Sequence, residues 1–144
     1  MYLPGDITET TCEDNNRCHG YAGDVNVNAA WKLLEKNAEA ILVDVRTTQE
    51  WEQTGLPDLK NLSKDAVKLS WIFLPSGEKN NQFVSEISNL RLANETPMLF
   101  LCRSGGRSQA AAIALTQQGY SRCFNVAGGV EGTNGWKASG LPLK

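Results

Sequence analysis

The sequence predicts a single α/β domain built on a mainly parallel central sheet. Apolar runs of strand length lie at residues 40–45 and 97–102, and such runs are typical of buried parallel strands. A last strand is predicted at residues 122–126. Between these strands lie two segments with helical character, residues 83–90 and 107–118. Strands that alternate with helices indicate an α/β fold, and 144 residues suffice for one domain with a conventional core.

The chain begins with a segment that shows no periodicity. Residues 1–20 are polar and are expected to form an irregular N-terminal arm, followed by the α/β domain over residues 21–144. A short strand is predicted at residues 22–26. Asn26 or Asn28 is then expected to cap the first helix, because an asparagine oxygen can accept a hydrogen bond from a free backbone N–H of the first turn.

The strand at residues 40–45 is followed by a helix-start signal. Thr47 and Glu50 fit a capping box, in which each side chain accepts from the other residue's backbone N–H. Gly55 is expected to end this short helix. Residues 56–65 are then predicted to be a loop.

The second half of the chain repeats the alternation. A modest strand is predicted at residues 66–70, and residues 75–81 carry turn chemistry. An amphipathic helix is expected over residues 83–90. The alanine-rich segment 107–118 predicts a further helix, with Gly119 in a position typical of helix ends.

Composition and charge exclude several classes of function. The net charge is −2 and no run of basic residues exists, so nucleic acid and acidic membrane surfaces are not expected partners. No apolar stretch approaches the length of a membrane span. The first ten residues contain neither a basic nor an apolar region of the kind found in secretory signals, which predicts a cytoplasmic location.

The cysteine pattern favours free thiols over a disulfide framework. No two cysteines form a CxxC pair, and in a reducing cytosol a reactive thiol is more common than a disulfide. Zinc requires about four ligands, and no promising set exists, so no metal and no cofactor are expected. Cys12, Cys18 and His19 would supply at most three zinc ligands, and Cys102 and Cys123 are the remaining cysteines.

Cys102 stands where a predicted strand ends and a glycine-containing loop begins. Ligands of open α/β sheets lie beyond the carboxyl ends of the strands. Two glycines permit a tight curl that aims backbone N–H groups inward, and the following helix adds its dipole. Such surroundings lower a thiol pKa, which predicts an accessible nucleophile; the plainer interpretation is a buried strand-end cysteine. The loop consists of Arg103, Ser104, Gly105, Gly106, Arg107 and Ser108.

Other cysteine chemistries fit this loop less well. A papain-like pair requires a histidine, and the chain has only His19, in the arm. A tyrosine-phosphatase-type loop requires an arginine six positions after the cysteine, to clamp the phosphate. Position 108 is serine, and Arg107 comes one residue early. The smaller loop suits a smaller adduct, such as a sulfur atom on the thiolate.

Four segments together resemble the single-domain rhodanese family. They read DVRTTQEW at residues 44–51, CRSGGRS at 102–108, NVAGGVE at 125–131 and GWKASGLP at 135–142. The resemblance runs from about Gly23 to Leu143. It implies a five-stranded, mainly parallel sheet flanked by helices, with the reactive cysteine at the start of the active-site loop.

The resemblance implies sulfur transfer. Cys102 would attack the outer sulfur of a donor such as thiosulfate, and the loop amides of residues 103–108 would hold the resulting persulfide. Cyanide or a thiol would then remove the sulfur. The implied partners are a small-molecule donor and acceptor, with a protein acceptor as a further option. Two alternatives stay open: a persulfide carrier that turns over thiosulfate poorly, and a cysteine phosphatase or arsenate reductase.

Asp44 and Arg46 are the expected supporting residues. Arg46 matches the arginine of the family's Asp-Val-Arg motif, which lies near the active site. Two roles are therefore expected for it, contact with an anionic donor or bracing of the loop. A purely structural salt bridge from Arg46 to Asp44 or Glu50 is an equally good interpretation.

Overall fold

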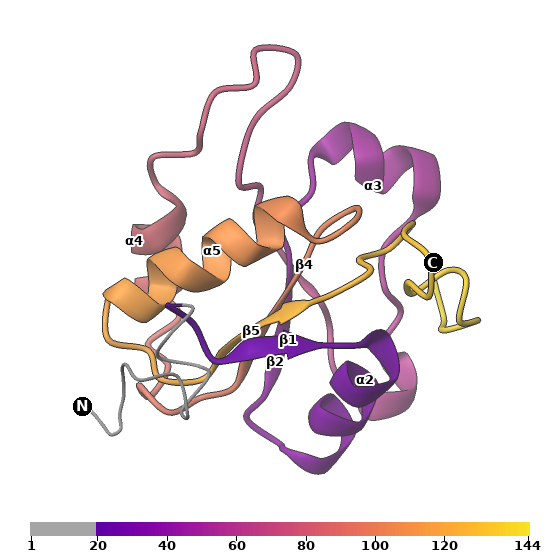
Figure 1. The fold of residues 1–144 in the computed structure, drawn as a ribbon, viewed down its shortest axis with the longest axis horizontal. Coiled ribbons are helices and arrows are strands. Elements are labelled where there is room, and N and C mark those ends of the chain that lie inside the picture. The colour runs from indigo at the N-terminus through magenta and orange to yellow at the C-terminus, as the bar shows by residue number, and fades with distance from the viewer. Residues whose placement is uncertain (1–19) are drawn as a thin grey trace.

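The computed structural model describes residues 20–144, so the predicted arm lies outside this part of the chain except for Gly20. Five strands form one sheet in the order β1-β5-β4-β2-β3, and every neighbouring pair is parallel (Figure 1). The predicted α/β fold with a mainly parallel sheet is confirmed. The strands are β1 (Gly23–Val25), β2 (Ile41–Asp44), β3 (Val67–Lys68), β4 (Met98–Leu101) and β5 (Cys123–Val126).

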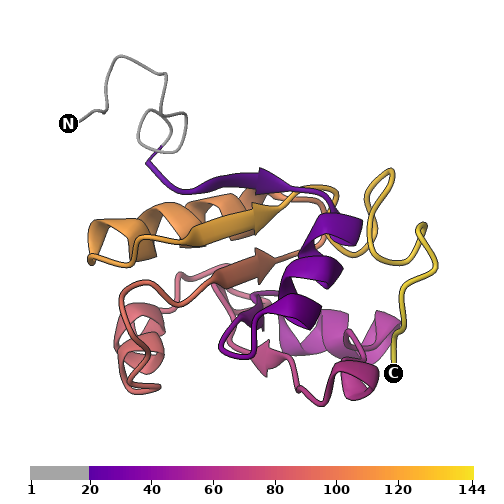
Figure 2. The same ribbon diagram turned by 90° about the horizontal axis from the view of Figure 1, so that it is seen from below.

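Helices cover both faces of the sheet. Helices α4 and α5 pack on one face and α2 packs on the other (Figure 2). Within residues 20–144, no helix combines the length and the apolar character needed to cross a membrane. The helices are α2 (Val27–Lys36), α3 (Thr48–Thr54), α4 (Phe83–Ser88), α5 (Gly106–Gln117) and the short 3₁₀ helix η1 (Lys60–Leu62).

The central strand β4 shows how the core is divided. All of its side chains are buried, and successive side chains of a strand point to opposite faces. Phe100 therefore joins the cluster under α4 and α5, whereas Leu99 and Leu101 join the cluster under α2. The second cluster also contains Trp136, which is fully buried and anchors the C-terminal segment against this face.

The helix-start signals of the sequence are present in the structure. Asn26 caps α2, because its Oδ1 accepts a 2.8 Å hydrogen bond from the backbone N–H of Ala29. Thr47 and Glu50 form both halves of the predicted capping box of α3. Gly55 ends α3 with a φ of +82°, a conformation that favours glycine. The local chemistry of the sequence therefore places α2 and α3 correctly.

Some boundaries differ from the prediction. Helix α5 begins at Gly106, one residue earlier than predicted. Helix α4 ends at Ser88, because the chain turns there and leaves Leu90 43% exposed, outside the apolar face. The predicted loop 56–65 contains η1, which is too short to give a periodic apolar signal.

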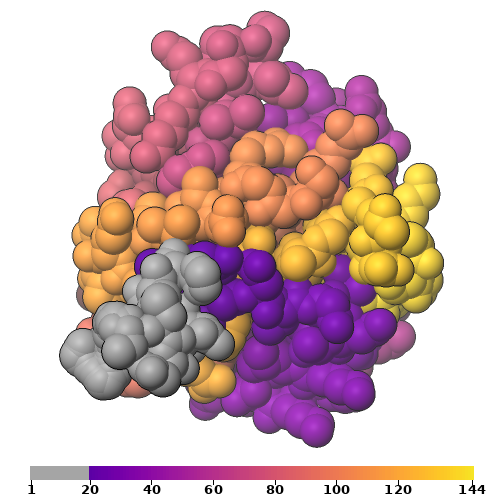
Figure 3. Space-filling view, viewed as in Figure 1, coloured from indigo at the N-terminus to yellow at the C-terminus, as the bar shows by residue number. Residues whose placement is uncertain are grey.

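The segment between β3 and α4 projects from the body of the molecule (Figure 3). An isolated antiparallel bridge joins Ile72 to Lys79 across the turn. Near its tip, Phe73 and Leu74 are 48% and 43% exposed. The turn predicted at residues 75–81 is therefore part of a protruding, partly apolar segment.

Candidate active site

Cys102 lies directly after the central strand β4, at the carboxyl edge of the sheet. The chain after β2 reaches the same edge, where the Val45 N–H donates to the Leu101 carbonyl at 2.8 Å. The chain after β5 reaches it as well, where the Val130 N–H donates to the Cys102 carbonyl at 2.9 Å. This edge is where open parallel sheets bind ligands, so three segments that are distant in sequence converge on one cysteine.

The sulfur of Cys102 lies among hydrogen-bond donors. The backbone N–H of Gly105 donates to Sγ, with an N···S distance of 3.1 Å. The Ser108 hydroxyl oxygen lies 3.2 Å from Sγ, within hydrogen-bond distance. Ser108 stands in the first turn of α5 and is fully buried. The loop and the first turn of the helix therefore present donors to one atom.

These donors change the acidity of Cys102. Burial by itself raises a thiol pKa, since it penalises the charged form. Hydrogen bonds from the Ser108 hydroxyl and from the backbone amides of Ser108, Gly105 and Ser104 act in the opposite direction and prevail. The pKa of Cys102 is therefore lowered from its ordinary value. A thiol in this state is a nucleophile at a lower pH than a free cysteine.

The sequence predicted an accessible thiol, and this expectation is wrong. Cys102 is only 2% exposed. The loop closes over the side chain, and the segment after β5 packs against the backbone of Cys102 and Arg103 through two amide hydrogen bonds of 2.9 Å each. A substrate that reaches Sγ must therefore end in a small atom or group.

The two loop glycines have different roles, although the sequence predicted the same freedom for both. Gly105 has a φ of +114°, a conformation that side chains other than glycine rarely adopt. Gly106 has no such φ and is the first residue of α5. A Cβ at Gly106 would meet no atom within 4 Å. The curl that aims the Gly105 amide at the sulfur therefore depends on Gly105 alone.

This difference predicts opposite effects of alanine at the two positions. Gly105→Ala is expected to destabilise the domain by about 1–2 kcal/mol and to raise the pKa of Cys102, because the strained backbone moves the amide donor. Gly106→Ala is expected to be neutral or stabilising by about 0.5 kcal/mol, since it enters a helix without strain. Urea unfolding and the pH dependence of Cys102 alkylation measure both effects. Equal losses in the two variants would contradict the assignment.

Gly129 supports the loop from the neighbouring segment. A Cβ on Gly129 would clash with the backbone carbonyls of Cys102 and Arg103. The absence of a side chain lets Val130 and Glu131 donate their N–H groups to these carbonyls, each at 2.9 Å. Glycine at position 129 is therefore required by a close approach of backbone to backbone.

Arg107 is held by an acidic residue of α3. Its Nη1 and Nη2 donate to Glu50 Oε1 and Oε2 at 2.7 and 2.9 Å. A positive charge near a helix N-terminus is unfavourable by itself, and the bidentate pair compensates for it. Glu50 thus serves both the capping box of α3 and the active-site loop. The sequence indicated the first role but paired Glu50 only with Arg46 as an alternative, and the structure shows no such pair.

The ion pair between Glu50 and Arg107 predicts a specific dependence of stability on pH. Burial raises the pKa of Glu50, but the Arg107 and Thr47 hydrogen bonds outweigh it and lower the value from 4.5 to about 2. A carboxyl with a depressed folded-state pKa contributes stability above its unfolded pKa and loses it as the pH falls through the folded one. The contribution of Glu50 is therefore complete above pH 4.5 and lost toward pH 2.

Glu50→Gln is consequently expected to lower the free energy of unfolding by on the order of 2 kcal/mol at neutral pH. The difference from the wild type should disappear near pH 2, which urea unfolding at several pH values measures. Glu52→Gln is the matched control, because Glu52 is exposed on the same helix and should change stability by less than about 0.5 kcal/mol. A difference that does not depend on pH would refute the linkage.

Arg46 is fully buried, and all three of its guanidinium nitrogens donate hydrogen bonds to protein groups. It pairs with Asp44, with 2.7 Å between Nη2 and Oδ2, and neither side chain is exposed. Its Nη1 donates to Thr54 Oγ1 and its Nη2 donates to the Gly55 carbonyl, both at 2.7 Å. Of the interpretations expected from the sequence, this geometry bears out the structural salt bridge to Asp44, and the same guanidinium forms a brace with Thr54 and Gly55. The brace ties the end of β2 to the end of α3.

Arg103 is the remaining charged residue of the loop. Its side chain is 64% exposed, and its Nε lies 3.6 Å from Glu131 Oε2. Exposed pairs of this kind contribute little to stability. Each of the three arginines expected near the site is thus next to a carboxylate: Arg46 to Asp44, Arg103 to Glu131 and Arg107 to Glu50.

Three polar residues that the sequence analysis did not select are connected to the sulfur through Ser108. Ser108 Oγ lies 2.6 Å from Asn125 Oδ1, and Asn125 Nδ2 donates to Asp24 Oδ1 at 3.0 Å. The Tyr21 hydroxyl also donates to Asp24 Oδ1, at 2.8 Å. The one sequence signal was Asn125 itself, an amide within the otherwise apolar strand β5.

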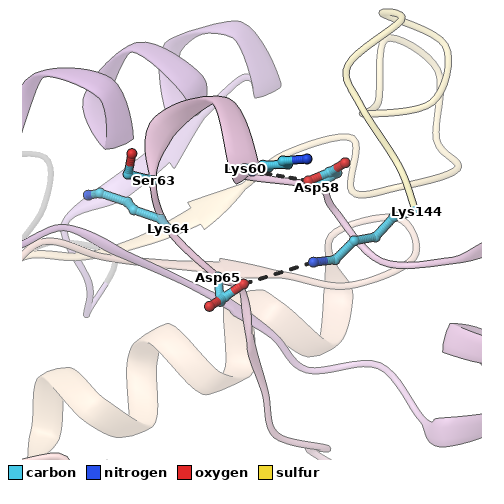
Figure 4. A pocket seen from close by; sticks show the side chains of 6 residues that line it. All are labelled: Asp58, Lys60, Ser63, Lys64, Asp65 and Lys144. Carbon is cyan, nitrogen blue, oxygen red and sulfur yellow. Dashed lines mark hydrogen bonds and ion pairs between the residues drawn. The ribbon is translucent and has the colours of Figure 1, made fainter.

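A polar hollow that Cys102 does not line is present in the domain (Figure 4). The Lys64 ammonium donates there to two backbone carbonyls, each at 2.7 Å, and Lys144 Nζ lies 3.9 Å from Asp65 Oδ1. None of the predicted site residues lines it. Its lining residues are Asp58, Lys60, Ser63, Lys64, Asp65 and Lys144.

Metal-ligating side chains do not cluster in the described part of the chain. Among residues 20–144, no group of three or more histidine, cysteine or acidic residues could hold a metal ion. The predictions for Cys12, Cys18 and His19 fall outside the described residues. Cys123 is described: it is buried, and burial raises the pKa of its thiol to about 11.

Comparison with known protein families and sequences identifies relatives. The model of the STR4 middle domain matches residues 22–144. An uncharacterized protein of Rickettsia conorii, RC0915, is 43% identical over 116 residues, which are 78% of this chain and 89% of that protein. The chloroplastic protein THYLAKOID RHODANESE-LIKE of Oryza sativa is 33% identical over 83% of this chain, a match that spans 25% of that protein. The thiosulfate sulfurtransferase GlpE of Actinobacillus pleuropneumoniae is 27% identical over 84% of this chain and 92% of GlpE.

A solved structure resembles most of the chain. The crystal structure of Rv0390 from M. tuberculosis superposes with a TM-score of 0.78 at 39% sequence identity, covering 86% of this chain and 98% of that chain. The five-stranded parallel sheet agrees with the fold that the resemblance implied. The chain belongs to the rhodanese-like family.

Proposed function

We propose that this protein is a sulfurtransferase that carries sulfane sulfur on Cys102 as a persulfide. The observation that carries the proposal is the surroundings of Sγ, which lies 3.1 Å from the Gly105 amide nitrogen and 3.2 Å from the Ser108 hydroxyl. Donors fixed by a folded loop stabilise negative charge without having to reorganise. A relative with the name thiosulfate sulfurtransferase supports the same chemistry.

The proposed reaction has two steps. The Cys102 thiolate attacks the outer sulfur of thiosulfate; a sulfur–sulfur bond forms to Sγ, and the bond within thiosulfate breaks with its electron pair leaving on sulfite. Cyanide, or a thiolate acceptor, then attacks the outer sulfur of the persulfide. The bond to Sγ breaks, thiocyanate or a new persulfide leaves, and the Cys102 thiolate is restored. The narrow access to Sγ suits a donor that presents a terminal sulfur atom.

A second candidate is a persulfide carrier that works through a protein donor or acceptor and turns over free thiosulfate poorly. The observation that favours it is the pairing of the loop arginines with carboxylates. Arg107 is bound by Glu50 and Arg103 lies beside Glu131, so little unpaired positive charge is left for a dianionic donor. A persulfide donor, whether on a protein or on a small thiol, does not depend on such positive charge in the loop.

Phosphatase chemistry is disfavoured by the geometry of Arg107. A phosphate-binding loop presents a free guanidinium fork to the phosphate. Here both terminal nitrogens of Arg107 are bound to the carboxylate of Glu50. A phosphate would have to displace that pair, and the arginine also stands one residue too early in the loop.

The test is the mass of the purified protein before and after exposure to thiosulfate or to a cysteine persulfide. We expect a gain of one sulfur atom on the peptide that contains Cys102, removed again by cyanide. Loading by both donors with steady thiocyanate formation supports the enzyme, and loading by the persulfide alone supports the carrier. No gain with either donor would overturn both proposals.

A further inference from the structure

A chain of hydrogen bonds leads from the sulfur of Cys102 to the surface beside β1. It runs from Sγ through Ser108 on α5 to Asn125 on β5 and ends at Asp24 on β1, with steps of 3.2, 2.6 and 3.0 Å. Strands β1 and β5 are adjacent and parallel, with Asp24 paired in register with Asn125 (Figure 1). Ser108 and Asn125 are 0% and 4% exposed, whereas Asp24 is exposed.

Asp24, at the surface end of this hydrogen-bond chain, determines which groups in it donate and which accept. An ionised carboxylate can only accept hydrogen bonds. The NH₂ group of Asn125 must therefore face Asp24, which leaves Asn125 Oδ1 toward Ser108. Tyr21 reinforces this arrangement, because its hydroxyl donates to the same Asp24 oxygen and accepts from Gln109 Nε2 at 2.9 Å. Burial raises the pKa of Tyr21, so its hydroxyl keeps its proton near neutral pH.

Ser108 then faces two acceptors with a single hydroxyl hydrogen. Asn125 Oδ1 lies 2.6 Å from Ser108 Oγ, and Cys102 Sγ lies 3.2 Å from it. When Cys102 is a thiol, every group is satisfied: the S–H donates to Ser108 and the Ser108 hydroxyl donates to Asn125. When Cys102 is a thiolate, the hydrogen can turn to the sulfur only by leaving the buried oxygen of Asn125 without a donor.

We propose that Asn125, oriented by Asp24, is a positioning residue that competes with Cys102 for the hydroxyl hydrogen of Ser108. Asn125 holds this hydrogen in the thiol state and yields it in the thiolate state. This step rests on the proposed function: in the persulfide state, Asn125 again accepts the hydroxyl hydrogen of Ser108, because the negative charge then lies on the outer sulfur. Asn125 and Asp24 thereby set how readily the resting cysteine ionises.

Other charged groups also act on Cys102 and must stay constant in a test. They belong to the loop, the end of β2, the first turns of α3 and α5, and the segment after β5. Each is paired with a neighbour of opposite charge, and none contacts Asp24 or Asn125 in the hydrogen bonds and ion pairs of the described chain. They are Arg103, Arg107, Glu50, Asp44, Arg46 and Glu131.

The first variant is Asp24→Asn, a nearly isosteric change at an exposed position. The new amide can donate to Asn125 Oδ1, so the Asn125 amide can turn and present its NH₂ to Ser108. Ser108 then accepts from Asn125 and donates to the sulfur. The pH midpoint of Cys102 alkylation by iodoacetamide should fall by about 0.5–1 unit, a three- to tenfold gain in thiolate below the midpoint. Alkylation is quantified by mass spectrometry on the peptide that contains Cys102, so that alkylation of the other cysteines does not contribute.

Asp24→Asn also removes a negative charge, which lowers a thiol pKa through space. Ser108→Ala separates the two causes, because it interrupts the chain of hydrogen bonds and leaves the charge of Asp24 in place. Alone, it should raise the midpoint by about 0.5–1 unit through the loss of a donor. In the Ser108→Ala background, Asp24→Asn should shift the midpoint by less than about 0.2 units.

Two results would overturn the proposal. An equal shift in both backgrounds would assign the effect to the charge of Asp24, and no shift in either would show that Asn125 does not compete for the hydrogen. A merely structural role of Asp24 would change the free energy of unfolding without moving the midpoint. Because alkylation requires no sulfur donor, this outcome is independent of whether sulfur transfer occurs.

Discussion

Replacing Cys102 by serine is expected to abolish sulfur transfer and persulfide formation. Serine keeps the size of the side chain, and its hydroxyl can still accept from the Gly105 amide. The domain should therefore fold with almost unchanged stability. Its hydroxyl is not ionised near neutral pH, however, and cannot carry sulfane sulfur. We expect the rate of thiocyanate formation to fall at least about a thousandfold, to the level of the uncatalysed reaction.

Cys123→Ser is the matched control for this loss. Cys123 is also buried in the domain, but burial raises the pKa of its thiol to about 11, and its Sγ lies 3.8 Å from the Tyr120 carbonyl. A serine hydroxyl can donate to the same carbonyl. This variant should load one sulfur atom as the wild type does. Sulfur transfer that survives in Cys102→Ser but is lost in Cys123→Ser would show that the wrong thiol has been assigned.

Arg46→Met is expected to cause the largest loss of stability. It leaves the fully buried carboxylate of Asp44 without its ion-pair partner. It also removes the donors to Thr54 and to the Gly55 carbonyl. Breaking a buried pair from one side destabilises a protein by about 3–5 kcal/mol, because an uncompensated charge stays buried. Urea unfolding measures the change.

Two further variants decide whether the loss arises from the buried pair. Replacing both partners, Asp44→Leu with Arg46→Met, should be less destabilising than Arg46→Met alone, since no charge is then left buried. Arg103→Gln, on an exposed side chain, should change stability by less than about 0.5 kcal/mol. An Arg46→Met protein that is stable to within about 1 kcal/mol but has a raised KM for thiosulfate would favour donor contact over bracing.

The sequence predicted the elements well where local chemistry decides them. Helix α2 begins after its capping asparagine, α3 begins at its capping box, and the apolar run before Cys102 is the buried strand β4. It failed on the extent of elements whose ends depend on packing. Strand β3 is reduced to Val67–Lys68, and η1 appears within a predicted loop, because neither leaves a periodic pattern.

The candidate site was predicted in part for the same reason. A cysteine, two glycines and the following helix are adjacent in sequence, so the loop could be recognised as a unit. The partners of its side chains come from other segments: Glu50 from α3, Asn125 from β5 and Asp24 from β1. No spacing in the sequence relates these residues to Cys102, since only the strand order brings them together.

By itself, the sequence determined the fold class, the position of Cys102 after a buried strand and the family resemblance. These depend on short-range patterns, namely apolar runs, caps and a loop with a glycine at the right place. Only the tertiary structure decided that Cys102 is covered, that Arg46 braces β2 against α3, and that Arg107 is bound to Glu50. Burial and charge pairing arise between segments that are distant along the chain, so the acidity of Cys102 is a property of the packed domain.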